Sequence, residues 1–329
     1  MRSDNFTFKA DDGQALFVYR HLPAGPLRGV VHIAHGMAEH AARYTRFAQA
    51  LTDAGFAVYA NDHRGHGRTA VDELGFFASS GGFLRVVRDL EQLLSYEQQQ
   101  HPGLPLVLFG HSMGSFFCQE VALRGRVALG ALILSGTSGK PSPLAQAGRV
   151  LARIERKRLG ERGRSDLLTR LSFGDFNRKF APNRTAFDWL SRDEAEVDRY
   201  IADALCGFPV TTSLWVDVLD GTAGIADPGR QAQIRKDLPI YLFAGARDPV
   251  GESGKSVTRL ADAYRAAGLR RVTLRLYPDA RHELLNETNR DEVTRELLAW
   301  LDQAVPRSAV VAPADLAAAP VSTAAPLDT

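Results

Sequence analysis

One short stretch constrains the fold of this chain more than any other. An apolar run at residues 106–109 leads into Gly110-His111-Ser112-Met113-Gly114, and residues 115–124 have the apolar spacing of a helix. The sequence therefore predicts a strand, a tight turn and a helix, with Ser112 at the apex of the turn. The two glycines suit this geometry because a side chain at either position would collide with the neighbouring backbone.

Apolar runs of strand type alternate with helical patterns along most of the chain. Strands are expected near residues 6–9, 16–21, 29–34, 56–60, 105–109, 129–135, 239–244 and 272–277. The continuous apolar run at 29–34 is typical of a strand that is buried on both faces of a parallel sheet. We therefore expect an α/β fold, in which helices cover both faces of a mostly parallel, twisted sheet.

The alternation stops after Gly136 and resumes about 100 residues later. Residues 138–236 contain helical patterns and little of strand type. We expect residues 1–137 and 237–305 to form one core, with 138–236 inserted as a helical cap over the carboxyl edge of the sheet. Open α/β sheets bind their ligands at that edge. Residues 306–329 are rich in Ala and Pro without periodicity, which predicts a disordered tail.

The turn at Ser112 predicts nucleophilic chemistry. A serine hydroxyl needs a histidine to accept its proton and a carboxylate to orient that histidine. In folds that place Gly-x-Ser-x-Gly between a strand and a helix, the chain order is serine, acid, histidine. His282 is the only histidine after Ser112, and Asp248 follows the strand expected at 239–244. We therefore predict Ser112, Asp248 and His282 as the catalytic residues.

Acyl transfer also needs hydrogen-bond donors for the oxyanion of the tetrahedral intermediate. We predict that the backbone N–H groups of Met37 and Met113 form this oxyanion hole. Met113 begins the helix after the turn, and Met37 follows the strand at 29–34. The residues expected to support these loops are His35, Gly36, Gly110, His111 and Gly114.

Several motifs together resemble one known family. They are His35-Gly36-Met37-Ala38-Glu39-His40 with Arg43-Tyr44, Asp62-His63-Arg64-Gly65-His66-Gly67, and the turn from Gly110 to Gly114. This set is similar to the monoacylglycerol lipase and lysophospholipase branch of the α/β-hydrolases, and the resemblance spans residues 6–304. It implies a capped α/β-hydrolase fold. It also implies a serine enzyme that cleaves one fatty-acyl ester from a glycerol-type head group without a cofactor.

Composition excludes several other classes of function. The net charge of +2 gives no reason to expect a nucleic-acid partner. The two cysteines, Cys118 and Cys206, are far apart, so we expect reduced thiols. The histidines at 32, 35, 40, 63 and 66 lack metal-site spacing, and we expect no metal. The N-terminus lacks the apolar stretch of a signal peptide, so a cytoplasmic location is expected.

The surface and lining of the cap are open to more than one interpretation. Residues 149–164 contain seven Lys or Arg against two Glu, which favours a solvated helix face. Transient contact with an anionic membrane surface stays open as an alternative. The aromatic residues of the insertion fit an acyl-binding pocket as well as the packed interior of the cap. The sequence predicts no oligomeric state.

Other activities on the same core also stay open. A peptidase, a thioesterase or an acyltransferase would use the same three catalytic residues. An epoxide hydrolase or dehalogenase would need an aspartate nucleophile, against which Ser112 argues directly. A non-catalytic ligand-binding protein is a further alternative, although an intact set of catalytic residues disfavours it.

Overall fold

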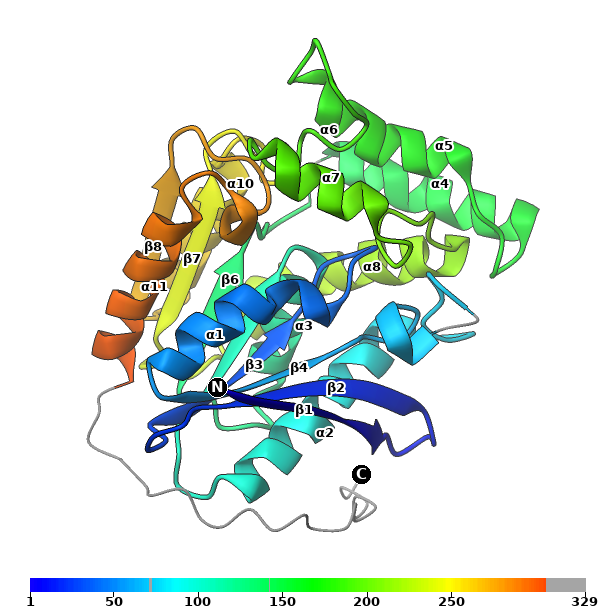
Figure 1. The fold of residues 1–329 in the computed structure, drawn as a ribbon. Helices are drawn as coiled ribbons and strands as arrows, with labels where there is room; N and C mark the ends of the chain where they lie inside the picture. The colour runs from blue at the N-terminus through cyan, green and yellow to red at the C-terminus, as the bar shows by residue number, and fades with distance from the viewer. Residues whose placement is uncertain (71–72, 142, 306–329) are drawn as a thin grey trace.

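The computed structural model describes residues 1–70, 73–141 and 143–305. Its centre is an eight-stranded sheet with the order β1-β2-β4-β3-β5-β6-β7-β8 (Figure 1). The strands are β1 (Arg2–Lys9), β2 (Ala15–Leu22), β3 (Gly29–Ala34), β4 (Phe56–Asn61), β5 (Leu106–His111), β6 (Ala131–Ser135), β7 (Ile240–Gly245) and β8 (Val272–Tyr277). The β1–β2 and β2–β4 pairs are antiparallel and the others are parallel. The predicted mostly parallel α/β sheet is confirmed, whereas the tail predicted at 306–329 lies outside the described residues.

Helices cover both faces of this sheet. One face packs against α1 (Thr45–Asp53) and α11 (Arg290–Ala304), and the other against α2 (Gly82–Gln100), α3 (Met113–Arg124) and α10 (Lys255–Ala266). All six residues of β3 are buried, as expected for a strand between two helical layers. None of the helices in the described ranges combines the length and apolarity needed to cross a membrane.

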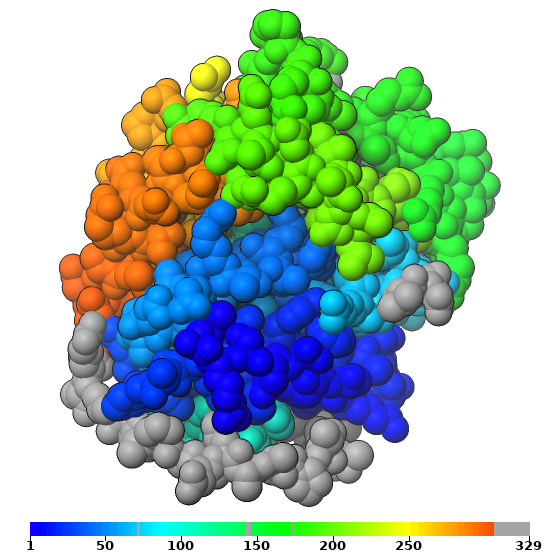
Figure 2. All heavy atoms as spheres, in the orientation of Figure 1, coloured from blue at the N-terminus to red at the C-terminus, as the bar shows by residue number. Residues whose placement is uncertain are grey.

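The segment between β6 and β7 is helical in its described part. Its helices are α4 (Pro143–Leu159), α5 (Asp166–Thr169), α6 (Asp175–Arg178), α7 (Glu194–Ala202), α8 (Thr212–Ile225) and α9 (Pro228–Gln231). Helix α8 packs against α4 and also against the core helices α2 and α3. Figure 2 shows these residues, in green, above the blue and orange core. The limits of the cap, 138–236, and of the core, 1–137 and 237–305, remain predictions.

Candidate active site

Ser112 occupies a strained turn between β5 and α3. Its φ is +49° and its ψ is −121°, a conformation that non-glycine residues seldom adopt. The two flanking glycines allow the turn. A Cβ atom on Gly110 would lie 2.6 Å from Cys118 Sγ, and one on Gly114 would lie 2.2 Å from the carbonyl oxygen of Ala34. The chain therefore needs glycine at both positions to hold Ser112 at the apex.

Asp248 and His282 come from neighbouring loops at the carboxyl edge of the sheet. Asp248 follows β7 and His282 follows β8, and His282 Nδ1 lies 2.9 Å from Asp248 Oδ2. Both side chains are buried, with exposed fractions of 2% for His282 and 0% for Asp248. Burial disfavours the charged imidazole, but the charge of Asp248 and this hydrogen bond outweigh it and raise the pKa of His282.

Ser112 and His282 line one cavity of about 870 Å³. Since His282 Nδ1 is bonded to Asp248, the Nε2 atom is the nitrogen left to act on a substrate or on Ser112. Across the described residues, no hydrogen bond joins Ser112 Oγ to His282, a bond that is often long in enzymes without substrate. The structure thus brings the three predicted catalytic residues into one site.

The two predicted oxyanion donors belong to two different segments next to Ser112. Met113 is the first residue of α3, and Met37 follows β3 in the loop that lines the cavity. Within the described part of the chain, neither backbone N–H group donates a hydrogen bond. Both donors are therefore available to a substrate oxygen.

The loop after β3 is held by buried polar contacts. Glu39 Oε1 accepts hydrogen bonds from Gly36 N at 2.6 Å and from Tyr44 Oη at 2.8 Å. His35 Nδ1 lies 2.8 Å from the Gly36 carbonyl oxygen, and its Nε2 accepts from His63 N at 3.0 Å. These contacts hold the backbone on which Met37 lies, and the supporting role of Gly36 and His35 stays a prediction.

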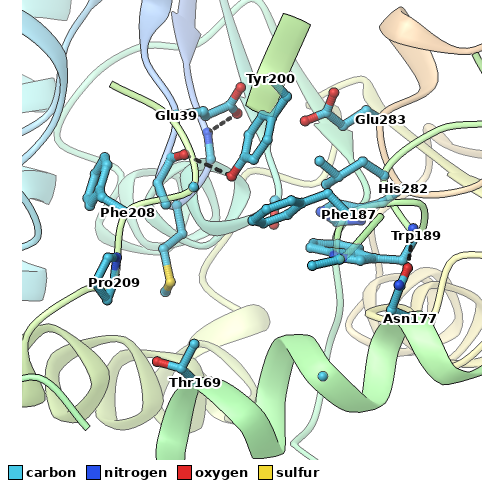
Figure 3. Close-up of a pocket in the computed structure, with 18 of the residues that line it drawn as sticks. Glu39, Thr169, Asn177, Phe187, Trp189, Tyr200, Phe208, Pro209, His282 and Glu283 are labelled. Atoms are coloured by element: carbon cyan, nitrogen blue, oxygen red, sulfur yellow. Dashed lines mark hydrogen bonds between the residues drawn. The ribbon is translucent and has the colours of Figure 1, made fainter. Parts of the chain in front are cut away.

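Two rings flank the imidazole of His282. The ring centroids of His111 and Trp189 lie 4.8 Å and 5.1 Å from that of His282. Figure 3 shows Trp189 beside His282, with Phe187 nearby. Burial and the proximity of His282 lower the pKa of His111 to about 4. His111 is therefore neutral at physiological pH and adds no charge next to His282.

Core loops and cap segments together line the cavity. Its apolar lining from the cap consists of Ala186, Phe187, Trp189, Leu190, Phe208 and Pro209. Polar side chains from α5 and α6, such as Thr169 and Asn177, also reach the lining. The cavity thus offers both apolar and polar surface within reach of Ser112.

The cap is hydrogen-bonded to both catalytic loops. On one side, His282 N donates to the Trp189 carbonyl oxygen at 3.4 Å, and Glu283 N donates to that of Leu190 at 2.8 Å. On the other side, the Ala38 carbonyl oxygen accepts from Gly207 N and from Tyr200 Oη, each at 2.9 Å. Figure 3 marks the bond of the Tyr200 hydroxyl with a dashed line. The cap therefore contacts the histidine loop and the loop of Met37 at the same time.

Several residues of this site have no catalytic or positioning role predicted from the sequence. Arg43 forms a two-pronged ion pair with Glu283, at 2.8 Å and 2.7 Å, and a further ion pair with Glu39. Glu39 and Arg43 belong to the motif after β3, and Glu283 follows His282 directly. Their positions next to predicted site residues could therefore have indicated that they belong to the site. Tyr200 lies in the cap, where no local pattern indicates which side chains face the core. Trp189 is one of the aromatic residues of the insertion for which the sequence leaves open an acyl-binding pocket or the packed interior of the cap, and it lines the cavity beside His282.

Comparison with known proteins identifies the family. A profile of the family described as "Serine aminopeptidase, S33" matches residues 25–289, most of the chain. The chain belongs to the α/β-hydrolase family. Its predicted place near the monoacylglycerol lipases is confirmed, because several curated proteins of that name match most of its length.

Two relatives and one solved structure illustrate the similarity. The monoacylglycerol lipase of Mycolicibacterium smegmatis is 31% identical, over 83% of this chain and 88% of that protein. The monoglyceride lipase of Mus musculus is 27% identical over 89% of each. A thermostable carboxyl esterase from Bacillus coagulans has a TM-score of 0.86 at 28% identity, covering 93% of this chain and 99% of that one. The chain is therefore an esterase or lipase of the serine hydrolase family.

Proposed function

We propose that this protein is a serine carboxylester hydrolase that cleaves a fatty-acyl monoester, of monoacylglycerol or lysophospholipid type, through an acyl-enzyme. One observation carries the proposal. His282 is joined to the buried carboxylate of Asp248 at 2.9 Å, and it lines the same cavity as Ser112, which lies at a strained turn. The apolar lining from the cap suits an acyl chain, and the names of the relatives point to the same substrate class.

The geometry supports a two-step reaction. His282 Nε2 takes the proton of Ser112 while Oγ attacks the ester carbonyl, and Asp248 stabilises the imidazolium that forms. The N–H groups of Met37 and Met113 donate to the oxyanion. His282 then protonates the leaving alcohol. In the second step it activates the water that releases the fatty acid and regenerates Ser112.

A serine substitution tests the nucleophile. We expect Ser112→Ala to lower turnover of a p-nitrophenyl ester by at least about a thousandfold, because the nucleophile is lost, while leaving the fold intact. Labelling with a fluorophosphonate should disappear as well. Ser95→Ala in α2, remote from the cavity, serves as the matched control. Substantial hydrolysis or labelling by Ser112→Ala would refute the assignment.

A substrate series tests the specificity. Monoacylglycerols and lysophospholipids of increasing chain length should be hydrolysed faster than the matching amides and thioesters. Because the family description names an aminopeptidase, aminoacyl amides belong in the panel. A higher kcat/KM for aminoacyl amides would make the protein a peptidase. Transfer of the acyl group to an added alcohol in preference to water would make it an acyltransferase.

We further propose that the cap contacts lipid surfaces transiently. Val150 and Ile154, one turn apart on α4, are 58% and 56% exposed, and Leu167 and Leu171 are 41% and 53% exposed. Arg149 and Arg153 pair with Asp220, so exposed apolar surface rather than unpaired charge carries this proposal. Val150→Asp with Ile154→Asp should weaken cosedimentation with anionic phospholipid vesicles without changing hydrolysis of a soluble ester. Unchanged cosedimentation would contradict the proposal.

A further inference from the structure

Three side chains of the kinds that bind metal ions lie close together where the cap contacts the loop after β3. His40 follows Glu39 in that loop, and Asp203 and Cys206 follow α7 in the cap. His40 Nε2 lies 2.8 Å from Asp203 Oδ2. One potential ligand atom from each of the three residues lies within 4.8 Å of the other two, and no second group of this kind occurs among the described residues.

A tight turn presents two of these side chains together. Cys206 N donates to the Asp203 carbonyl oxygen at 3.0 Å, and Leu205 N donates to Asp203 Oδ1 at 2.8 Å, which leaves Oδ2 for His40. Gly207 continues the turn with a φ of +67°. The Asp-x-x-Cys spacing matches the Cys-x-x-Cys spacing common in zinc sites. The turn therefore delivers a carboxylate and a thiol from one short segment.

The turn is docked on the loop that carries His40. Gly207 N donates to the Ala38 carbonyl oxygen at 2.9 Å, two residues before His40. His40 is 7% exposed, and its Nδ1 atom is buried without a hydrogen-bond partner in the described part of the chain. The polar contact of this imidazole is thus on the side of Asp203.

Local charge favours a cation at this position. The charged groups that act on Cys206 are the carboxylates of Glu39, Asp203 and Glu283 and the guanidinium of Arg43, three negative charges against one positive charge. Arg43 is itself ion-paired with Glu39 and Glu283.

We propose that His40 Nε2, Asp203 Oδ2 and Cys206 Sγ bind a soft divalent cation of the Zn²⁺ type. Water completes a tetrahedral coordination. On binding, the S–H bond of Cys206 breaks, a sulfur–metal bond forms and the proton leaves to solvent. The proton on His40 Nε2 moves to Nδ1. This site departs from the absence of a metal expected from the sequence, and no step of the proposed ester hydrolysis runs through it.

A bound cation would join the cap to the loop that carries Met37. His40 belongs to the core loop, and Asp203 and Cys206 belong to the cap. Metal binding would therefore stabilise the contact between cap and loop, and more strongly the higher the affinity for the metal. The concentration of the metal would therefore control how stably the cap is held against the core at this contact. The metal site stands or fails independently of the substrate and of the catalytic residues.

Cobalt binding to the full chain tests the site directly. After treatment with a chelator, titration with Co²⁺ should give one equivalent of binding and a thiolate-to-cobalt charge-transfer band, which Zn²⁺ abolishes by competition. Binding should tighten from about pH 6 to about pH 8, because the Cys206 proton is released. Absence of the band, or a band that Zn²⁺ does not displace, would overturn the proposal.

Matched variants locate the ligands. Cys206→Ser should abolish the band, and Asp203→Asn and His40→Gln should weaken Co²⁺ binding by more than about tenfold, the loss that even outer-shell changes cause. Cys118→Ala, which alters the buried cysteine of α3, should retain both band and affinity. Circular dichroism without metal verifies that each variant is folded. A band that survives in Cys206→Ser, or disappears in Cys118→Ala, contradicts the assignment.

Discussion

His282 and His111 are adjacent imidazoles whose surroundings separate their pKa values. Burial disfavours the charged form of both. Asp248 reverses this effect for His282, whose pKa is raised, whereas the pKa of His111 falls to about 4. One ring can therefore accept a proton from Ser112 while its neighbour stays neutral. A divergence of this kind between neighbouring groups is typical of acid–base sites.

The direction of the His282 shift predicts a pH dependence. Hydrolysis needs neutral His282, so kcat/KM should fall as pH decreases through its pKa, with a midpoint above the ordinary value of 6.5. Asp248→Asn should move this midpoint downward, because burial then acts unopposed, and should also lower kcat. A pH–rate profile on a soluble ester measures both effects. Asp262→Asn, at an exposed position, is the control. The prediction would be contradicted if the pH–rate profile of the natural protein had its midpoint below 6.5 and Asp248→Asn left that midpoint unchanged.

At the level of single residues, the order of serine, aspartate and histidine along the chain made the catalytic residues predictable. The side chains that pack around them could not be predicted. Only one histidine follows Ser112, and Asp248 lies on the loop after a strand between the two, so sequence alone could propose Ser112, Asp248 and His282. Nothing local indicates that Trp189 lies 5.1 Å from His282, since this contact joins a cap segment to a core loop. The roles of these residues remain predictions until they are substituted.

Among the elements, the strands were the most predictable part. The expected limits of β3 and β8 coincide with those observed, because turn residues bound each run. The contacts between the cap and the catalytic loops were beyond sequence analysis. Tyr200 and Ala38 are 162 residues apart, and no periodicity relates positions at that separation.

The hydroxyl of Tyr200 connects α7 to the backbone beside Met37. It donates to the Ala38 carbonyl oxygen, and Ala38 has a φ of +53°, a conformation that needs support from its neighbours. We expect Tyr200→Phe to lower kcat by up to about tenfold with a smaller change in KM, as for the loss of one buried hydrogen bond. Tyr59→Phe, which removes a buried contact with His101, should leave kcat unchanged. Equal effects of both variants on kcat would argue against a positioning role.

Across the whole molecule, cap and core also meet away from the cavity. Asp217 of α8 is 9% exposed, and its Oδ1 accepts a hydrogen bond from Gly82 N, the first residue of α2, at 3.1 Å. A carboxylate at this position complements the positive end of the α2 dipole. Burial nevertheless raises the pKa of Asp217 to about 6, despite the opposing effect of the Gly82 N–H group.

This raised pKa predicts how stability changes with pH. The folded protein holds the Asp217 proton more tightly than the unfolded chain, whose carboxyl pKa is about 3.9. Asp217 therefore removes stability as pH rises from about 4 to about 6. The free energy of unfolding of Asp217→Asn, relative to the natural chain, should increase over that interval. Urea unfolding at several pH values measures it, with exposed Asp262→Asn as the control, and a difference that is flat or declines with pH would contradict the prediction.

Three of the hydrogen bonds between the cap and the catalytic loops join main-chain atoms on both sides. Carbonyl oxygens of Trp189, Leu190 and Ala38 accept from backbone N–H groups, so side chains at these positions can change without loss of the bonds. Proline is the exception at the donor positions, Gly207, His282 and Glu283, because it has no N–H group. These three bonds can therefore persist while the side chains of the cap that line the cavity diverge in evolution. Exchanging cap segments between relatives is accordingly a practical route to new specificities on this core.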